Sequence, residues 1–575
     1  MELLINQVGY ECDGEKSALL QCGADLDIRG HVRLLRQEDD HLLLETPLVA
    51  AGCVPGWQGR HYWRADFSAF TEPGHYRLEA VVTTGAQERL VRSPSFAIGR
   101  GLLARRCLSD VIHYFKGQRA SGTFDRADRR ARLFGTDQRR DVHGGWFDAS
   151  GDMSKYLSHL SYANYLNPQQ TPMVVWSLLK CRELLATRRD IDGVNLCKRL
   201  NDEGLHGADF LCRMQDERGF FYMTLFDKWS KDPEQRELCA YATQQGIKSA
   251  RWQAGFRQGG GMAIAALARA AREPSGGDLD TSQYAEAARR GYLHLREHNL
   301  AYLDDGVENI IDDYCALLAA VELTRTLGAE WLAEARDRAG RLCARQRAHP
   351  DLGHHWAAND DGSRPYYHAA EAGLPVLALL EYLAIEPDPA RQWAARTVAE
   401  QALAAELALA ARAGNPFALA RQYVKGVDEA PRVSFFMPHH NESGYWWQGE
   451  NARLASLATM AFAAAQHLPG QSALLRTFGQ QQLDWILGRN PFNACMLAGQ
   501  GINNPEYTAG YPNAQGGICN GITAGFDDEN DVAFIPEAYK DRLDQNWRWG
   551  EQWIPHAAWF ALAITWQSAQ GGHHD

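Results

Sequence analysis

The segment from Gly144 to Tyr156, GGWFDASGDMSKY, places two carboxylates four residues apart on a glycine-rich bend. Like charges this close repel, so Asp148 and Asp152 need a reason to be together. One reading is structural, in which Asp152 caps the next helix and Asp148 closes a turn. The other is chemical, because two carboxylates can hold one water by two hydrogen bonds while one of them accepts its proton. The neighbouring Trp146 and Phe147 suit stacking on a sugar ring. The spacing is unlike that of an EF-hand calcium loop.

A second candidate group lies near the C-terminus, in EAYKDRLDQNWRWGEQWIPHAAWFALA. Glu551 stands there among Trp547, Trp549 and Trp553. A carboxyl group surrounded by tryptophans is poorly solvated, which raises its pKa and keeps it protonated as a general acid. The structural alternative is a first-turn residue of the last helix, favoured by the helix dipole.

Together the two groups predict cleavage of a glycosidic bond. A protonated acid on one side and an ionised base on the other give inversion when roughly 6.5–9.5 Å separate them, leaving room for water. The expected catalytic residues are Asp148, Asp152 and Glu551.

The chain must position these groups with two regions of different period. Residues 1–98 alternate apolar and polar side chains, as in HYWRADFSAF and PGHYRLEAVV, between glycine and proline turns. This pattern predicts a small all-β sandwich of immunoglobulin type. From GLLARRCLSDVIHYF onward, apolar residues recur every three to four positions, which predicts a mostly helical region over 99–575.

Alanine-rich stretches recur in this second region. They are GGGMAIAALARAARE, DDYCALLAAVELTRTLG, EAGLPVLALLEYLAIE, NARLASLATMAFAAAQHL and IPHAAWFALAITWQSA. Alanine favours helix and allows helices to approach closely. Similar helices joined by long loops suggest helical hairpins closed into a ring, with functional residues in the loops at one end.

Four motifs in order resemble those of glycoside hydrolase family 9. They are the NQVGY and PGHY stretches of an immunoglobulin-like module, GGWFDASGD, LDWILGRNPFNACMLAGQG, and YKDRLD leading to Glu551. The GGWFDASGD stretch is one residue longer than the family pattern. The resemblance implies an (α/α)6 barrel behind the sandwich and an inverting mechanism. It implies Asp152 as general base, Asp148 as its partner on the water, and Glu551 as general acid.

The sequence departs from the family where cellulases usually carry a histidine and an arginine that grip the sugar, because NNPEYTAGYPNAQGG has neither. We expect MPHHNESGYWWQGEN to supply that grip, and the acidic run DDENDVAF to supply a counter-charge for a cationic sugar. A solvated loop or a calcium site is the alternative for the acidic run. The predicted substrate-binding residues are Trp146, His439, His440, Glu442, Trp446, Trp447, Asp528, Tyr539 and Trp553.

The expected substrate is a short β-1,4-linked oligosaccharide from which single sugars are released. The arrangement resembles the exo-β-D-glucosaminidases of the family, whose substrates carry an ammonium at C2 that suits a carboxylate partner. The alternatives are an exo-β-glucosidase on cellobiose or cellodextrins, an endo-β-1,4-glucanase, and a carbohydrate-binding protein without activity.

Composition narrows the partners. A net charge of -12 disfavours nucleic acid, and no apolar run is long enough for a membrane span. The N-terminus lacks a basic segment followed by an apolar one, so we expect a cytoplasmic protein. The 12 scattered cysteines predict buried thiols rather than disulfides or a zinc site. We expect a monomer or homodimer that needs no cofactor and no catalytic metal, with structural calcium as an option.

Overall fold

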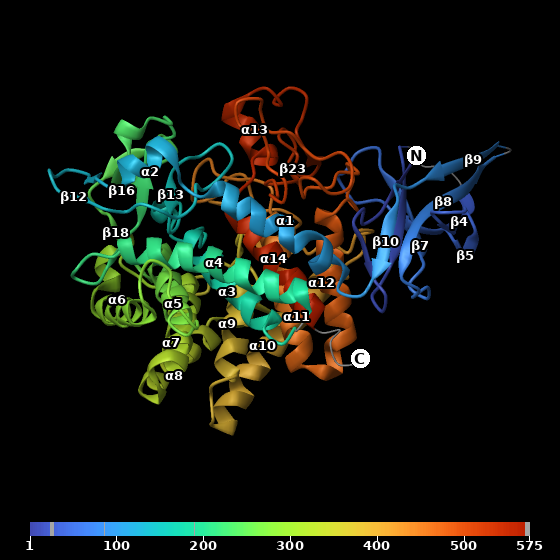
Figure 1. Ribbon diagram of the computed structural model, residues 1–575. Coiled ribbons are helices and arrows are strands. Elements are labelled where there is room, and N and C mark those ends of the chain that lie inside the picture. The colour runs from blue at the N-terminus through green and yellow to red at the C-terminus, as the bar shows by residue number, and fades with distance from the viewer. Residues whose placement is uncertain (24–27, 86, 189, 570–575) are drawn as a thin grey trace.

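The structure is a computed structural model that describes residues 1–23, 28–85, 87–188 and 190–569. Its N-terminal part consists of strands and its larger remainder mainly of helices (Figure 1). The N-terminal strands are β1 (Glu2–Leu4), β2 (Gly9–Glu11), β3 (Ser17–Cys22), β4 (Ile28–Arg36), β5 (Leu42–Pro47), β6 (Val49–Gly52), β7 (His61–Asp66), β8 (Gly74–Thr84), β9 (Gln87–Arg92) and β10 (Phe96–Gly99).

These strands form two sheets that pack face to face. Among the described residues, one sheet has the order β1-β3-β7-β6 and the other the order β2-β10-β8-β4-β5, with β9 beside β8. Alternate residues of β7, Trp63 and Ala65, enter the core between the sheets, as the period of two predicts. Trp57, between β6 and β7, is also buried, and so is Tyr62 on the other face of β7. Both side chains pack on the helical region.

The chain changes from strands to helices between Gly99 and Leu102. The helices are α1 (Leu102–Gln118), α2 (Gly122–Asp128), α3 (Thr171–Leu185), α4 (Ile191–Arg213), α5 (Gly261–Ala270), α6 (Thr281–Tyr302), α7 (Ile310–Leu327), α8 (Leu332–Cys343), α9 (Leu374–Leu383), α10 (Pro389–Ala410), α11 (Asn451–His467), α12 (Ser472–Ile486), α13 (Leu543–Gly550) and α14 (Ile554–Ala569).

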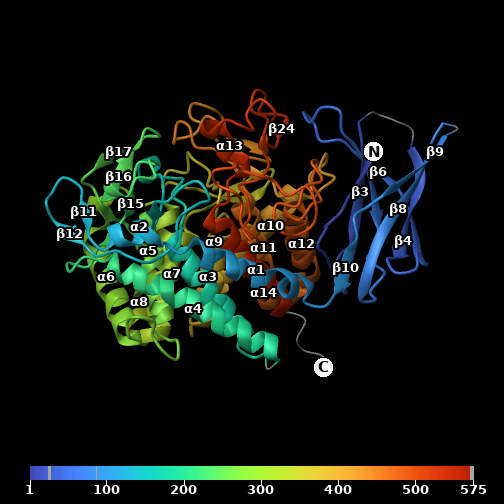
Figure 2. The ribbon, with the colours of Figure 1, turned by 45° about the horizontal axis from the view of Figure 1, so that its top comes forward.

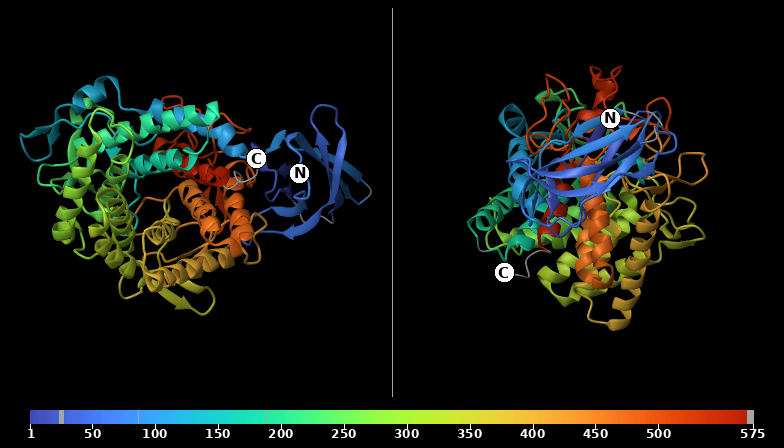
Figure 3. Two further views of the ribbon diagram at one scale, coloured as in Figure 1. Left: turned by 60° about the horizontal axis from the view of Figure 1, so that its bottom comes forward. Right: turned by 90° about the vertical axis from the view of Figure 1, so that its right-hand side faces the viewer.

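The long helices form two concentric layers. Within the described residues, α3, α5, α7, α9, α11 and α14 contact one another in that order, and α14 returns to α3, so that the inner ring closes (Figure 3, left). Each inner helix is backed by an outer one, in the order α4, α6, α8, α10, α12 and α1. All five alanine-rich stretches form inner helices, because a helix buried on every side needs small apolar residues all round.

Short strands in the loops connect the helical layers at one end of the ring. They are β11 (Ala131–Leu133), β12 (Arg139–Arg140), β13 (Lys155–Tyr156), β14 (Phe221–Tyr222), β15 (Thr224–Phe226), β16 (Glu237–Ala242), β17 (Ile247–Ser249), β18 (Gln253–Ala254), β19 (Gln346–His349), β20 (Gly353–Trp356), β21 (Gln422–Val424), β22 (Arg432–Ser434), β23 (Thr523–Ala524) and β24 (Val532–Ala533). The pairing of β13 with β15, and of β15 with β16, joins the loop before α3 to the loop before α5. These loops lie above the ring in Figure 2.

The sandwich is bound to the ring by polar and aromatic contacts. Asn6 donates to the buried Asp484 of α12 at 2.9 Å. The ring of Trp57 lies against Phe435 and Trp485, with centroids 5.4 and 6.1 Å apart. The carboxylate of Glu11 accepts from the backbone N–H groups of Gly101 and Leu102 at the start of α1, each at 2.8 Å.

The cysteines of the described chain are unpaired, and most of them are buried. All 12 cysteines lie in the described part of the chain and are free thiols, and Cys53 is the exposed one. None of the described helices combines the length and the apolar character needed to span a membrane.

Candidate active site

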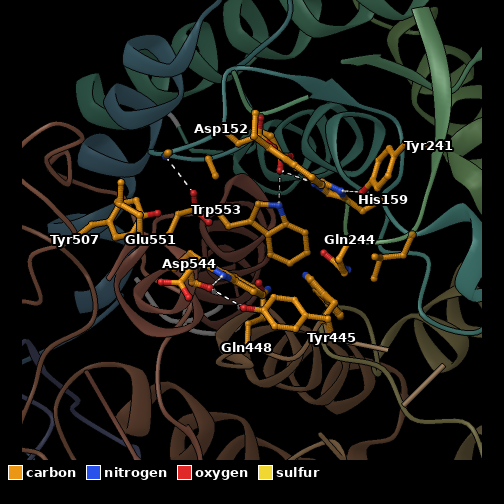
Figure 4. Close-up of a pocket in the computed structure, with 18 of the residues that line it drawn as sticks. Asp152, His159, Tyr241, Gln244, Tyr445, Gln448, Tyr507, Asp544, Glu551 and Trp553 are labelled. Carbon is orange, nitrogen blue, oxygen red and sulfur yellow. Dashed lines mark hydrogen bonds and ion pairs between the residues drawn. The ribbon is translucent and has the colours of Figure 1, made fainter. Parts of the chain in front are cut away.

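The loops that precede four inner helices enclose a cavity of about 470 Å³ (Figure 4). They are the loops before α3, α5, α11 and α14. The lining residues are Asp148, Ala149, Gly151, Asp152, His159, Leu160, Trp229, Lys231, Tyr241, Gln244, Tyr445, Trp446, Gln448, Tyr507, Leu543, Asp544, Trp547, Glu551 and Trp553.

The loop that carries the paired aspartates is held from below by a buried lysine. Lys155 donates to the carbonyls of Val142 and Gly144, at 2.9 and 2.7 Å, and forms an ion pair with Asp128 at 2.8 Å. Asp128 also pairs with Arg236. These contacts fix the glycine-rich bend that the sequence places before Asp148.

Each aspartate accepts three hydrogen bonds from the protein. Asp148 accepts at Oδ1 from the amide of Gln170, and at Oδ2 from Trp553 Nε1 and His159 Nε2, both at 3.0 Å.

Asp152 accepts at Oδ1 from the N–H of Ser154 at 2.9 Å, and at Oδ2 from Tyr156 Oη at 2.7 Å and Trp229 Nε1 at 3.1 Å. A carboxylate offers about four acceptor positions. One position therefore remains on Oδ1 of each aspartate, which is the arrangement needed to hold one water between them.

Burial and repulsion raise the pKa of Asp152 to about 6. Burial is the larger cause, the charge of Asp148 adds to it, and the ring of His159 opposes it. Like charges in one buried site cannot both ionise at low pH. Asp152 is therefore a base whose pKa lies near neutrality, which suits proton transfer from water.

Glu551 faces the same cavity from the loop before α14. Its Oε1 accepts from the N–H of Gly151 at 3.1 Å, which leaves Oε2 to carry a proton. Burial first, and then the charges of Asp152 and Asp148, raise its pKa well above the usual range. A Cβ at residue 151 would lie 2.6 Å from Glu551 Oε1 and 2.8 Å from Tyr507, so the close approach requires glycine.

Strained backbone brings further side chains into the cavity. Lys228, Trp229 and Lys231 all have left-handed φ values of 57 to 60°. The carboxylate of Asp227 compensates by accepting from the N–H groups of Trp229 and Lys231, each at 3.0 Å. Such strain is typical of functional loops.

The structure brings together five of the predicted catalytic and substrate-binding residues: Asp148, Asp152, Glu551, Trp446 and Trp553 line the cavity, and Trp547 and Asp544 of the C-terminal motif join them. Trp146 does not, because it is buried in the core between Phe115 and His206 and donates to Glu203. Stacking of Trp146 on a sugar is therefore corrected to core packing.

The histidine pair is also placed outside the cavity. His439 stacks on Trp447 with ring centroids 3.6 Å apart, and burial lowers its pKa to about 4. The ring of Trp447 packs on the guanidinium of Arg548. His440 is exposed at the surface, and Glu442 forms an ion pair with Arg364. The lining of the cavity therefore includes none of His439, His440, Glu442 and Trp447.

The acidic run lies apart as well. Asp528 accepts from Asn530 in a turn, and Tyr539 packs on Phe526 with centroids 4.2 Å apart. Both border a separate hollow of about 380 Å³. This placement removes the reason to see Asp528 as the counter-charge of a bound sugar, and calcium there stays a prediction.

Several lining residues were not found from the sequence. His159, Trp229, Gln244, Tyr445, Gln448 and Tyr507 occupy loops without periodicity, and Tyr241 lies on the short strand β16. The available signal was the unusual length of the segments before α3 and α5, since long irregular loops are often functional.

Asp148, Asp152 and His159 are also close enough to offer three ligand atoms within 4.8 Å of one another. The histidine Nε2 is already directed at Asp148 Oδ2, and the protein donors fill most of the acceptor positions on both carboxylates. The donor set therefore fits a water site better than a metal centre.

Comparison with known proteins identifies the family. Residues 105–509 match the glycosyl hydrolase family 9 sequence family, and residues 1–84 match the cellulase N-terminal Ig-like domain. The chain belongs to glycosyl hydrolase family 9. It is therefore a glycoside hydrolase with the inverting mechanism general to that family.

Solved structures agree in fold. A metagenome-derived family 9 endoglucanase is 20% identical with a TM-score of 0.67, and 99% of each chain is covered. The family 9 endoglucanase J30 is 18% identical with a TM-score of 0.63, covering 97% of this chain and 99% of its own.

The endoglucanase CelQ from Clostridium thermocellum, complexed with cellotetraose, is 15% identical with a TM-score of 0.52. It covers 82% of this chain and 71% of its own. No curated protein matches the chain.

Proposed function

We propose that this family 9 enzyme hydrolyses short β-1,4-linked oligosaccharides, with Asp152 as general base and Glu551 as general acid. The proposal rests on one observation: Asp148 and Asp152 each keep one free acceptor position while Glu551 is tied to the same loop through Gly151. The closed inner ring of six helices in the described chain, each with an outer partner, supports an (α/α)6 barrel as the framework.

The reaction follows from these positions. Glu551 donates its proton to the glycosidic oxygen as the bond from C1 breaks. A water held by Asp148 and Asp152 attacks C1 from the opposite face, and Asp152 takes the proton of that water. The product sugar is released with inverted configuration. Proton exchange with solvent then restores the acid and the base.

The first candidate substrate is a β-1,4-glucan, cleaved internally. The solved structures that resemble this chain are endoglucanases, and one of them holds cellotetraose. Trp446 and Trp553 line the cavity with their ring centroids 6.3 Å apart. Their indole faces suit the flat faces of glucose units.

The second candidate is the release of single glucosamine units from chitosan oligosaccharides. The lining of the cavity favours it, because Asp544 lies there beside the catalytic aspartates and can accept from an ammonium group while it pairs with Arg542. Leu160 and Gln244 line the same cavity, and Gln244 is bonded to Tyr162 at 2.9 Å. This bond joins the loop before α5 to the loop before α3.

Proton NMR of the purified enzyme distinguishes the candidates. Chitosan disaccharide, cellobiose and diacetylchitobiose are first supplied separately. The glucosamine tetramer and cellotetraose, each labelled at its reducing end, are then supplied to locate the bond that is cleaved. Fast cleavage of the glucosamine dimer, and monomer as the first product of the tetramer, favour the glucosaminidase. Internal cleavage of cellotetraose favours the endoglucanase. The Glu551→Gln variant is the control, and a β-anomer at the newly formed reducing end of the first product would contradict the mechanism.

A further inference from the structure

His159 connects the catalytic aspartates to a buried hydroxyl on another loop. Its Nε2 lies 3.0 Å from Asp148 Oδ2, and its Nδ1 lies within hydrogen-bond distance of Tyr241 Oη (Figure 4). Tyr241 belongs to β16, 82 residues further along the chain. The two side chains meet because β13, β15 and β16 share a sheet.

The direction of each hydrogen bond can be assigned. An ionised carboxylate only accepts hydrogen bonds, so the contact with Asp148 requires a proton on His159 Nε2. In the neutral ring Nδ1 is then the acceptor, and Tyr241 Oη donates to it. The chain from Tyr241 through His159 to Asp148 therefore runs in one direction.

The backbone beside His159 is strained. Leu160, the next residue, has a φ of 57°, a left-handed conformation that is unfavourable for a leucine. The ring of His159 also lies on Tyr156 with centroids 3.5 Å apart. Tyr156 is the residue that donates to Asp152. The imidazole of His159 thus bonds Asp148 directly and packs on the tyrosine that donates to Asp152.

We propose that His159, held as the Nε2–H tautomer by Tyr241, is a positioning residue for the hydrolytic water. By fixing Asp148 Oδ2 and the ring of Tyr156, it keeps the free positions on the two aspartates turned toward each other. This role rests on the proposed function of the aspartates, whereas the tautomer itself does not.

The tautomer is measured by NMR of protein labelled with ¹⁵N in its histidine rings, with His159 assigned by its absence in His159→Gln. We expect a protonated Nε2 and an unprotonated Nδ1. Tyr241→Phe removes only the hydroxyl and should change the His159 signals. Tyr222→Phe is the matched control, because it removes another buried hydroxyl, bonded to Asp216 at 2.6 Å, on the neighbouring strand β14.

Kinetics test the role in hydrolysis, using whichever of chitosan disaccharide, cellobiose and cellotetraose the wild type cleaves. Tyr241→Phe should lower kcat roughly tenfold with KM nearly unchanged, and His159→Ala roughly a hundredfold. His159→Gln, which keeps an N–H donor, should retain more activity than His159→Ala. Added imidazole should partly restore His159→Ala.

Wild-type kcat and unchanged His159 signals in Tyr241→Phe would overturn the proposal. Equal loss in Tyr241→Phe and Tyr222→Phe would also overturn it, because the effect would then follow from removing any buried tyrosine hydroxyl on the short strands of these loops. If the wild type cleaves none of these three sugars, the proposed function fails, and the tautomer measurement still decides the hydrogen-bond chain by itself.

Discussion

Ser150 and Gln552 exchange hydrogen bonds across the active site. The N–H of Ser150 donates to the carbonyl of Gln552 at 2.9 Å, and the N–H of Gln552 donates to Ser150 Oγ at 3.0 Å. Ser150 lies between the two aspartates, and Gln552 follows Glu551. The serine lies within the stretch that is one residue longer than the family pattern, and it ties the loop of the base to the loop of the acid.

Ser150→Ala should reduce kcat about tenfold while leaving the fold intact. The buried N–H of Gln552 loses its acceptor, so Glu551 is held less firmly against Gly151. Steady-state kinetics and thermal unfolding measure the two effects. Ser109→Ala, which removes a surface hydroxyl bonded to Arg199, is the control. A wild-type kcat for Ser150→Ala would show that the link has no role in positioning the acid.

Asp152→Asn and Glu551→Gln should each lower kcat by roughly a hundredfold or more. Each change removes the group that accepts or donates the proton and leaves its size nearly unchanged. Asp528→Asn serves as the control, because that carboxylate lies outside the cavity. Near-normal turnover in either of the first two variants would contradict the assignment of base and acid.

The pH profile of kcat/KM should fall on the acidic side near pH 6. The base must be ionised, and burial with the charge of Asp148 raises the pKa of Asp152 to about 6. Glu551, whose pKa is raised well above its usual range, stays protonated through neutrality. Because Asp152 has a raised pKa, its contribution to stability is present at low pH and is lost as pH rises through about 6.

Asp148→Asn tests the cause of this profile. Removing the like charge should lower the pKa of Asp152 and of Glu551 together, so both limbs move to lower pH while kcat falls. The measurement is kcat/KM in buffers from about pH 4 to about pH 9, which extends roughly two units below the acidic limb and about two units above neutrality. Limbs that stay in place would mean that burial alone sets both pKa values.

The N-terminal sandwich should be needed for stability of the helical ring. A chain starting near residue 99 loses the ring contacts of Trp57 and the bond from Asn6 to Asp484. We expect it to unfold about 10 °C lower or to be insoluble. Trp57→Ala should destabilise the full chain by about 3–5 kcal/mol. Leu90→Ala, at a side chain 56% exposed on β9, is the control. A soluble truncated chain with wild-type stability would contradict this.

Local pattern was enough to predict the strand region, the helical region that follows it and five of the inner helices. Alternation of apolar residues marks the strands before Gly99, and alanine-rich apolar stretches mark five of the inner helices, because burial on every side leaves no polar face. The amphipathic stretch beginning at Leu102 forms the outer helix α1, because a helix with one polar face can leave that face exposed to solvent. The short motifs located Asp148, Asp152 and Glu551, since spacing along the chain is visible in a sequence.

The tertiary structure alone decided which side chains meet in the cavity. Trp146, Trp447 and Trp553 look alike as tryptophans beside acidic motifs, but only Trp553 lines the cavity, because exposure depends on what packs from distant elements. His159 and Tyr241 meet through strand pairing across 82 residues. Such contacts are set by the register of the sheet and the closure of the ring, which no local pattern records.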